Sequence, residues 1–273
     1  MPSNRIETTK QPGLFVAHGA PDVMLSDIPA RKFLTELGPR LPTPRGIVVV
    51  SAHWQTNDLR MTGPSTLETI YDFFGWPAPL YGIVYHASGA EWLNERLARV
   101  LDKAGYTVRL ALRRGLDHGA WVPLSLMFPK ADIPVVQLSL LRSASPELHF
   151  RIGQALDGLR HEGVMILGSG GLVHNLRQLM PEGTPPDSWA QSFDTWLFDR
   201  LKTRALPELF DYASQAEYAN LAQPTDEHLL PLFVSMGAGW SEEHTKNIHR
   251  SFSYGNLSMA SYAFVDPNAM ATT

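Results

Sequence analysis

Five of the ten histidines stand beside small residues at the ends of apolar segments or open an expected helix. These five are His18, His53, His118, His174 and His228. Imidazole is the commonest ligand of borderline-soft metal ions and exchanges protons near neutral pH. The chain has no cysteine, so a metal ion here would be held by histidine and carboxylate. The pattern predicts one metal site with spare histidines for proton transfer.

His18 and His53 each terminate an apolar run that is typical of a buried strand. The two runs cover residues 13–17 and 46–52. Strand ends can be neighbours in one sheet, where two imidazoles could share an ion at about 2.0–2.2 Å. Two histidines do not make a site, so spacing alone leaves this interpretation open.

His228 opens an expected helix over residues 226–236, next to Asp226 and Glu227. It is the third candidate ligand. The alternative is that the acidic residues only offset the helix dipole, with Thr225 or Asp226 as the N-cap, and need no metal.

His118 and His174 are the candidates for proton transfer. The carboxylate of Asp117 could orient His118 as a general acid or base, or His118 could be an exposed turn residue. His174 follows a run of glycine and serine, where the backbone can approach a ligand closely. Its alternative is a helix start capped by Ser169. The remaining histidines are interpreted as solvated or as core residues bonded to backbone: His86, His149, His161, His244 and His249.

Segments typical of strands and helices alternate along the chain. Strands are expected over residues 13–17, 46–52, 106–112, 133–140, 164–167, 248–254 and 257–265. Helices are expected over residues 27–37, 90–104, 146–161, 189–202, 207–218 and 226–236. This alternation predicts an α/β fold, with a central, mostly parallel or mixed sheet covered by helices on both faces. No linker divides the chain, so residues 1–273 are expected to form a single catalytic domain.

An aromatic, proline-rich segment over residues 71–85 interrupts this alternation. Pro77 and Pro79 exclude a regular helix there. Its aromatic side chains could wall a pocket and stack on an aromatic ligand, or the segment could be a loop that covers the core.

Composition narrows the class of protein. The 273 residues are 44% hydrophobic and 18% charged, with a formal net charge of -4. No basic cluster indicates nucleic-acid binding, and no apolar run reaches the roughly 18 residues that span a bilayer. The polar N-terminus lacks the apolar region of a signal peptide. We therefore expect a cytoplasmic protein that binds neither nucleic acid nor membrane.

Several segments together resemble the class III extradiol ring-cleavage dioxygenases, in the DOPA 4,5-dioxygenase-like branch of the LigB superfamily. The segments, in family order, are AHGAP (17–21), VVVSAHW (48–54), YDFFGWP (71–77), LY (80–81), GLDHGAW (115–121), VVQLS (135–139), GSG (168–170), VHNLR (173–177) and EHLLPL (227–232). The resemblance covers the whole chain and implies a LigB-like fold.

The resemblance also implies a site. It assigns His18, His53 and His228 to one divalent metal ion, and places His118 and His174 in the catalytic pocket. Better-studied ring-cleaving relatives use two histidines and a glutamate, whereas the third matching position here is His228. Three neutral imidazoles leave the full +2 charge at the ion, which suits Zn(II) as well as Fe(II).

The implied reaction is the O2-dependent opening of a catechol ring, DOPA or another substituted catechol, to a semialdehyde. Fe(II) is expected to support it because O2 needs a redox-active metal, and zinc is redox-inert. By resemblance His174 is assigned as the base for the catechol proton, and His118 is the candidate for the second proton carrier. The sequence leaves the division of roles between these two histidines open. Arg177 is a candidate partner for a substrate carboxylate, or a surface residue.

Two other classes of protein remain open. In a zinc hydrolase the same three histidines would activate water. In a non-enzymatic metal-binding adaptor there would be no turnover, although such a protein would have no use for His118 and His174. The sequence leaves the particular catechol, the cleaved bond and the oligomeric state undetermined.

Overall fold

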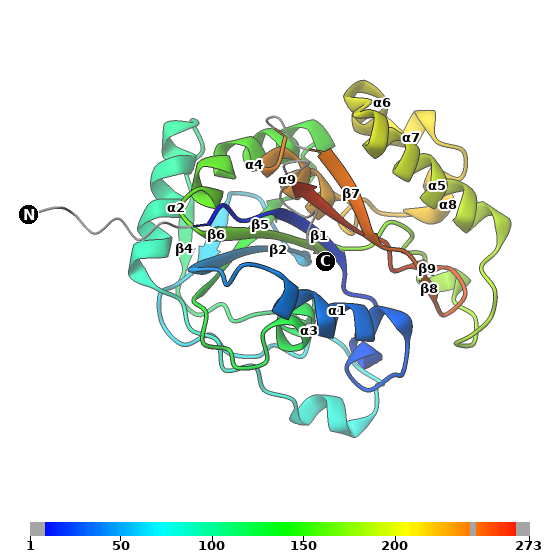
Figure 1. Cartoon of the computed structure of the whole chain (residues 1–273), viewed down its shortest axis with the longest axis horizontal. Helices are drawn as coiled ribbons and strands as arrows, with labels where there is room; N and C mark the ends of the chain where they lie inside the picture. The colour runs from blue at the N-terminus through cyan, green and yellow to red at the C-terminus, as the bar shows by residue number, and fades with distance from the viewer. Residues whose placement is uncertain (1–8, 241–243, 266–273) are drawn as a thin grey trace, which may run out of the picture.

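Strands β1 and β2 lie on either side of β6, near the middle of the sheet (Figure 1). Among the residues that the computed structural model describes, 9–240 and 244–265, eight strands form one sheet in the order β4-β3-β5-β2-β6-β1-β10-β7. They are β1 (Gly13–Ala17), β2 (Gly46–Thr56), β3 (Arg60–Thr62), β4 (Arg109–Ala111), β5 (Val135–Leu141), β6 (Val164–Gly170), β7 (His244–His249) and β10 (Ser261–Val265). Strands β5, β2, β6 and β1 are parallel, whereas β3 and β10 join them antiparallel. The sheet is mixed, as predicted.

Helices cover both faces of this sheet (Figure 1). One face carries α2 (Glu91–Lys103), α4 (Pro146–Arg160) and α9 (Leu230–Ala238), and the other carries α1 (Pro29–Arg40) and α3 (His118–Met127). Helix α2 packs through Leu93, Leu97 and Leu101, which recur every fourth residue and are fully buried. The predicted fold class is confirmed.

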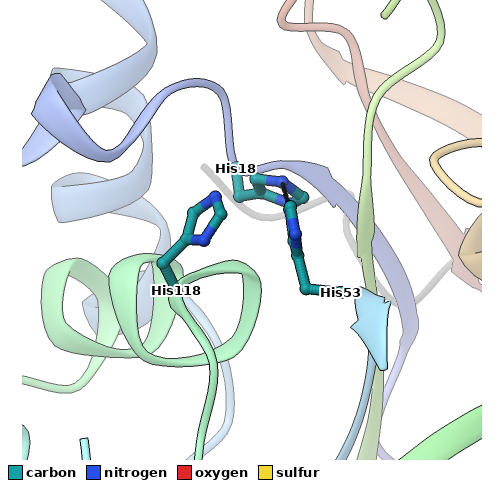
Figure 2. A group of neighbouring side chains, drawn as sticks. All are labelled: His18, His53 and His118. Carbon is teal, nitrogen blue, oxygen red and sulfur yellow. Dashed lines mark hydrogen bonds between the residues drawn. The ribbon is translucent and has the colours of Figure 1, made fainter. Parts of the chain in front are cut away.

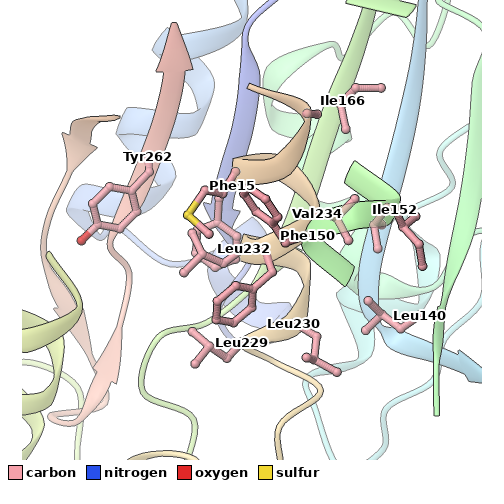
Figure 3. Close-up of a cluster of buried hydrophobic side chains, with 14 of the residues drawn as sticks. Phe15, Leu140, Phe150, Ile152, Ile166, Leu229, Leu230, Leu232, Val234 and Tyr262 are labelled. Carbon is pink, nitrogen blue, oxygen red and sulfur yellow. The ribbon is translucent and has the colours of Figure 1, made fainter. Parts of the chain in front are cut away.

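Alternate residues of each strand enter different cores. In β2, Val48 and Val50 belong to the core under α4 and α9, whereas Ile47 and Val49 belong to the core under α3. Figure 3 shows part of the first core, where Phe15 of β1 lies among side chains of α9. This alternation determines toward which face of the sheet the side chain of a residue at a strand end points.

Two expected helices differ from the structure. The one over residues 207–218 is broken into α6 (Leu206–Phe210) and α7 (Tyr212–Gln215), and Tyr218 has a left-handed φ of 64° before α8 (Ala219–Ala222). The one over residues 226–236 begins only at Leu230, with Pro231 in its first turn, where proline favours a helix start. Neither expected cap residue is the N-cap, which is Leu229.

The remaining elements lie around the sheet. They are α5 (Ser188–Thr203), a two-stranded sheet of β8 (Phe252–Ser253) and β9 (Leu257–Ser258), and the short 3-10 helices η1 (Pro21–Met24), η2 (Ala78–Gly82) and η3 (Leu176–Gln178). The segment 71–85 contains no helix besides η2, in agreement with the prediction. Within the described part of the chain, no helix combines the length and the apolar content needed to cross a bilayer.

Candidate metal centre

His18 and His53 point toward each other from β1 and β2, the two strands that flank β6 (Figure 2). His18 directly follows β1, and His53 lies within β2 rather than beyond its end. Side chains alternate between the two faces of a strand, and Val16 in β1 and Val49 in β2 face α3. His18 lies two positions after Val16 and His53 four positions after Val49, so both histidines are on the same face. Their Nε2 atoms lie 3.1 Å apart, so the predicted convergence of the two imidazoles is observed.

His118 is the first residue of α3 and faces the same centre (Figure 2). Its ring centroid lies 4.0 Å from that of His53 and 5.4 Å from that of His18. One ring nitrogen from each of these three histidines lies within 4.8 Å of the others, which is the spacing of a possible metal site.

Gly119 allows this close approach of α3 to the sheet. A Cβ atom there would lie 2.3 Å from Ser51 Oγ, 2.9 Å from His53 Cδ2 and 3.2 Å from His18 Cε1. Such distances are too short for any side chain, so the imidazoles and the helix can meet only at a glycine.

His228 reaches the centre from the turn before α9. Its carbonyl accepts a hydrogen bond from Gly171 N, and a Cβ on Gly170 would lie 2.0 Å from the same oxygen. The ring centroid of His228 lies 5.5 Å from that of His18 and 5.0 Å from that of His53.

His174 stacks on His228, with centroids 3.3 Å apart and planes inclined by 10°. Its backbone N–H donates to Ala222 O, which holds the loop after β6. His174, Glu227 and His228 form a second group whose possible ligand atoms lie within 4.8 Å of one another. All five histidines singled out from the sequence therefore meet at one edge of the sheet.

Hydrogen bonds at Nδ1 determine where two of these imidazoles carry their proton. The hydroxyl of Ser169 donates to Gly119 O, so it accepts from His18 Nδ1 at 3.0 Å. The carboxylate of Glu227 can only accept, so His228 Nδ1 donates to it at 2.9 Å. Both imidazoles are left with a lone pair on Nε2.

His118 is held in the same way by Asp72, which the sequence did not single out. Asp72 Oδ1 accepts from both Nδ1 and the backbone N–H of His118, each at 2.9 Å. Asp72 Oδ2 lies 3.5 Å from Nδ1 of His53. The expected orienting carboxylate, Asp117, instead caps α3 and binds Arg114. The sequence offered one signal for Asp72, namely that it is an acidic residue within the aromatic segment.

Burial keeps the surrounding imidazoles neutral. It lowers the pKa of His53 to about 3 and the pKa of His174 to about 4, with help from neighbouring imidazoles. Burial, together with the neighbouring histidines, also holds the pKa of His18 and of His228 well below the usual value. Metal ligation requires neutral imidazole, so the environment favours the form that binds.

The residues fit a cation. His228 Nε2 is buried and has no hydrogen-bond partner among the described residues. An unsatisfied buried acceptor costs about 1–3 kcal/mol unless something binds it. Nitrogens that share one tetrahedral ion at about 2.0–2.1 Å lie about 3.3 Å apart, close to the 3.1 Å between the Nε2 atoms of His18 and His53.

The ordinary interpretation holds for two other histidines. His149 is a core residue that bonds Ser145 O and Leu141 N, and His86 is exposed. Ser169 does not cap a helix before His174. In the aromatic segment, Phe73 packs against His118 at 5.6 Å between centroids, so this part of the segment does border the site.

Comparison with known proteins identifies the family. Residues 13–265 match the family described as the catalytic LigB subunit of aromatic ring-opening dioxygenase. The chain belongs to the LigB family. It is therefore an enzyme of the extradiol dioxygenase type, and its clustered histidines have the spacing that could hold a metal ion. The extent of the catalytic domain over the whole of residues 1–273 stays a prediction.

Individual LigB relatives agree over almost their full length. The chain is 40% identical to a 4,5-DOPA dioxygenase extradiol of Beta vulgaris, over 92% of this chain and 95% of the relative. It is 39% identical to a protein of the same name from Escherichia coli K12, over 94% and 95%. A crystal structure of an uncharacterized Escherichia coli K12 protein matches with a TM-score of 0.79 at 36% identity, covering 93% of this chain and all of that one.

Proposed function

We propose that this LigB protein opens the ring of a catechol with O2 by extradiol cleavage, using one Fe(II) ion held by His18, His53 and His228. The observation that carries the proposal is the meeting of buried, neutral imidazoles whose Nε2 atoms face one centre, with a lone pair on Nε2 of His18 and of His228. The names of the relatives, 4,5-DOPA dioxygenase extradiol, support DOPA or another substituted catechol as the substrate.

The choice of His228 over His118 as the third ligand rests on its unpartnered, buried Nε2 atom. His228 also has a lowered pKa caused by burial and by His174, which favours the neutral form that a ligand needs. His118 is then available for proton transfer at the start of α3.

A bound Fe(II) ion would supply electron exchange with O2 and a positive charge that favours the catecholate. The protein's own residues handle the protons. His174, with a pKa of about 4 in the free site, is neutral at pH 7 and ready to accept a hydroxyl proton from the substrate. His118 faces the centre from the start of α3 and returns a proton later in the cycle. Phe73, packed against His118, borders the site at a position where it can contact the aromatic ring of the substrate.

The test starts from protein stripped of metal and reloaded anaerobically with Fe(II) or with Zn(II). Uptake of O2 is then followed with a panel of catechols that includes DOPA. We expect uptake matched to a yellow ring-opened product with iron and none with zinc. Activity toward an ester or amide with zinc and without O2 would replace this proposal by a hydrolase. Stoichiometric iron without any uptake would favour an adaptor.

A further inference from the structure

The carboxylate of Asp72 lies between two imidazoles of the site. One oxygen accepts two hydrogen bonds from His118, and the other lies 3.5 Å from Nδ1 of His53. Asp72 lies outside both groups of possible ligand atoms. We propose that Asp72 is a positioning residue that holds His118 and His53 in the same tautomer, with both protons on Nδ1 and both Nε2 atoms facing the centre.

The position of the proton on each imidazole supports this role. An ionised carboxylate accepts hydrogen bonds and donates none, so Nδ1 of His118, at 2.9 Å, must carry the proton. The negative charge also favours the proton on Nδ1 of His53, 3.5 Å away. One oxygen of Asp72 accepts from two donors of His118, each at 2.9 Å, and the other oxygen faces Nδ1 of His53. The carboxylate therefore presents acceptors to both imidazoles.

The backbone around Asp72 is fixed, as a positioning role requires. Ile70 N donates to Leu116 O, and Ile70 O accepts from the indole N–H of Trp121 in α3. The hydroxyl of Tyr71 donates to Ile83 O at 2.8 Å, which closes the aromatic segment on itself. The segment before Asp72 is thus joined to the segment that leads into His118.

The same contacts link substrate binding to ligand orientation. The ring of Phe73, the next residue, packs nearly perpendicular to that of His118, and Tyr71 packs against Trp121. The segment that borders the site therefore also carries the group that orients a proposed metal ligand and a proposed proton carrier. This inference rests on the proposed metal set.

Asp72→Asn has an unequal effect on the two imidazoles. The amide oxygen is expected to stay at His118, because both the backbone N–H and Nδ1 of that residue donate to it. The amide NH2 then faces Nδ1 of His53, which must accept and move its proton to Nε2. A protonated Nε2 cannot bind a metal ion, so His53 is lost as a ligand. If His53 instead kept its proton on Nδ1, that N–H would face the amide NH2, and two donors would oppose each other.

The experiment measures zinc affinity by chelator competition and histidine tautomers by 15N NMR of metal-free protein. We expect Asp72→Asn to weaken zinc binding about 10- to 100-fold, the usual effect of losing an outer partner of a ligand. Its His53 signal should change to the Nε2–H tautomer. Glu68→Gln, which changes an exposed carboxylate four residues before Asp72, is the matched control and should change neither.

Wild-type protein provides a test that does not depend on the folding of a variant. Its metal-free spectrum should show Nδ1–H at both His53 and His118, with signals assigned by their loss in His53→Gln and His118→Gln. A proton on Nε2 of either residue would overturn the proposal, as would unchanged zinc affinity in folded Asp72→Asn. Neither readout requires catechol turnover, so failure of the dioxygenase proposal would be seen separately.

Discussion

His174 lies flat against His228, with the two ring centroids 3.3 Å apart. The stacked pair brings the loop after β6 into contact with the turn before α9. Nδ1 of His228 is bonded to Glu227, so the His228 ring is fixed at one edge by a carboxylate and on one face by an imidazole. A side chain restrained in this way loses little conformational freedom when it binds an ion.

We predict that His228→Gln abolishes stoichiometric metal binding, whereas His118→Gln retains it. Loss of an outer partner alone costs about 10- to 100-fold in metal affinity, so loss of a ligand should cost more than about 100-fold. Metal content after dialysis, measured by mass spectrometry on folded protein, checks this. The opposite result would assign the third ligand to His118, which the grouping of His18, His53 and His118 also allows geometrically.

His174→Phe should keep the stacking contact with His228 and the metal, but lose the proton acceptor. We expect the turnover number of the iron-loaded enzyme to fall about 10²- to 10⁴-fold, the usual contribution of a general base. Stopped-flow absorbance of the ring-opened product measures it, with iron content as the control. Near-normal turnover would remove His174 from the base role.

The metal-free protein should lose stability as the pH falls from about 6.5 toward 4. Unfolded histidines bind protons below about pH 6.5, whereas the pKa in the folded protein is about 3 for His53 and about 4 for His174. The unfolded state therefore binds more protons in this window, at about 1.4 kcal/mol per proton per pH unit.

Urea unfolding of metal-free protein between pH 7 and pH 4 measures this slope. His53→Gln should reduce the slope by removing one such group. His86→Gln, which changes an exposed histidine, should leave it unchanged. A stability that does not vary with pH would show that the cluster is not held neutral.

Gly119→Ala should damage the site although it adds only a methyl group. The new Cβ would lie 2.3 Å from Ser51 Oγ and 2.9 Å from the His53 ring, so α3 or the imidazoles must shift. We expect a loss of about 1–3 kcal/mol in the free energy of unfolding and weaker zinc binding. Gly158→Ala in α4, where a Cβ meets nothing within 4 Å, is the control and should be neutral or stabilising. Calorimetry with and without zinc separates the two effects.

The sequence predicted most of what depends on local pattern. The expected strand over residues 13–17 has the observed bounds of β1, because a continuous apolar run between polar segments is buried on both faces. The five histidines could be recognised because each lies beside small residues at the end of an apolar segment or at the start of an expected helix. The late start of α9 was missed because Pro231, which favours the first turn of a helix, lies inside the expected range.

The relationships between residues far apart in the chain could not be predicted in this way. Asp72 and His118 are 46 positions apart, and the period of neither segment indicates that they meet. The same holds for the bond between His18 and Ser169, which places the proton on one nitrogen of a candidate ligand. Tautomers depend on such partners, so they become visible only when the fold is known.

The place of β1 in the sheet affects when the protein can acquire its metal. This strand, which leads directly into His18, pairs with β6 and with β10, whose residues 164–170 and 261–265 leave the ribosome much later. His228 likewise follows His18 by more than two hundred positions. A nascent chain thus carries its first proposed ligand for most of translation without the strands that orient it. Ion loading is therefore expected only after synthesis has passed the last strand, when the polypeptide can close its sheet.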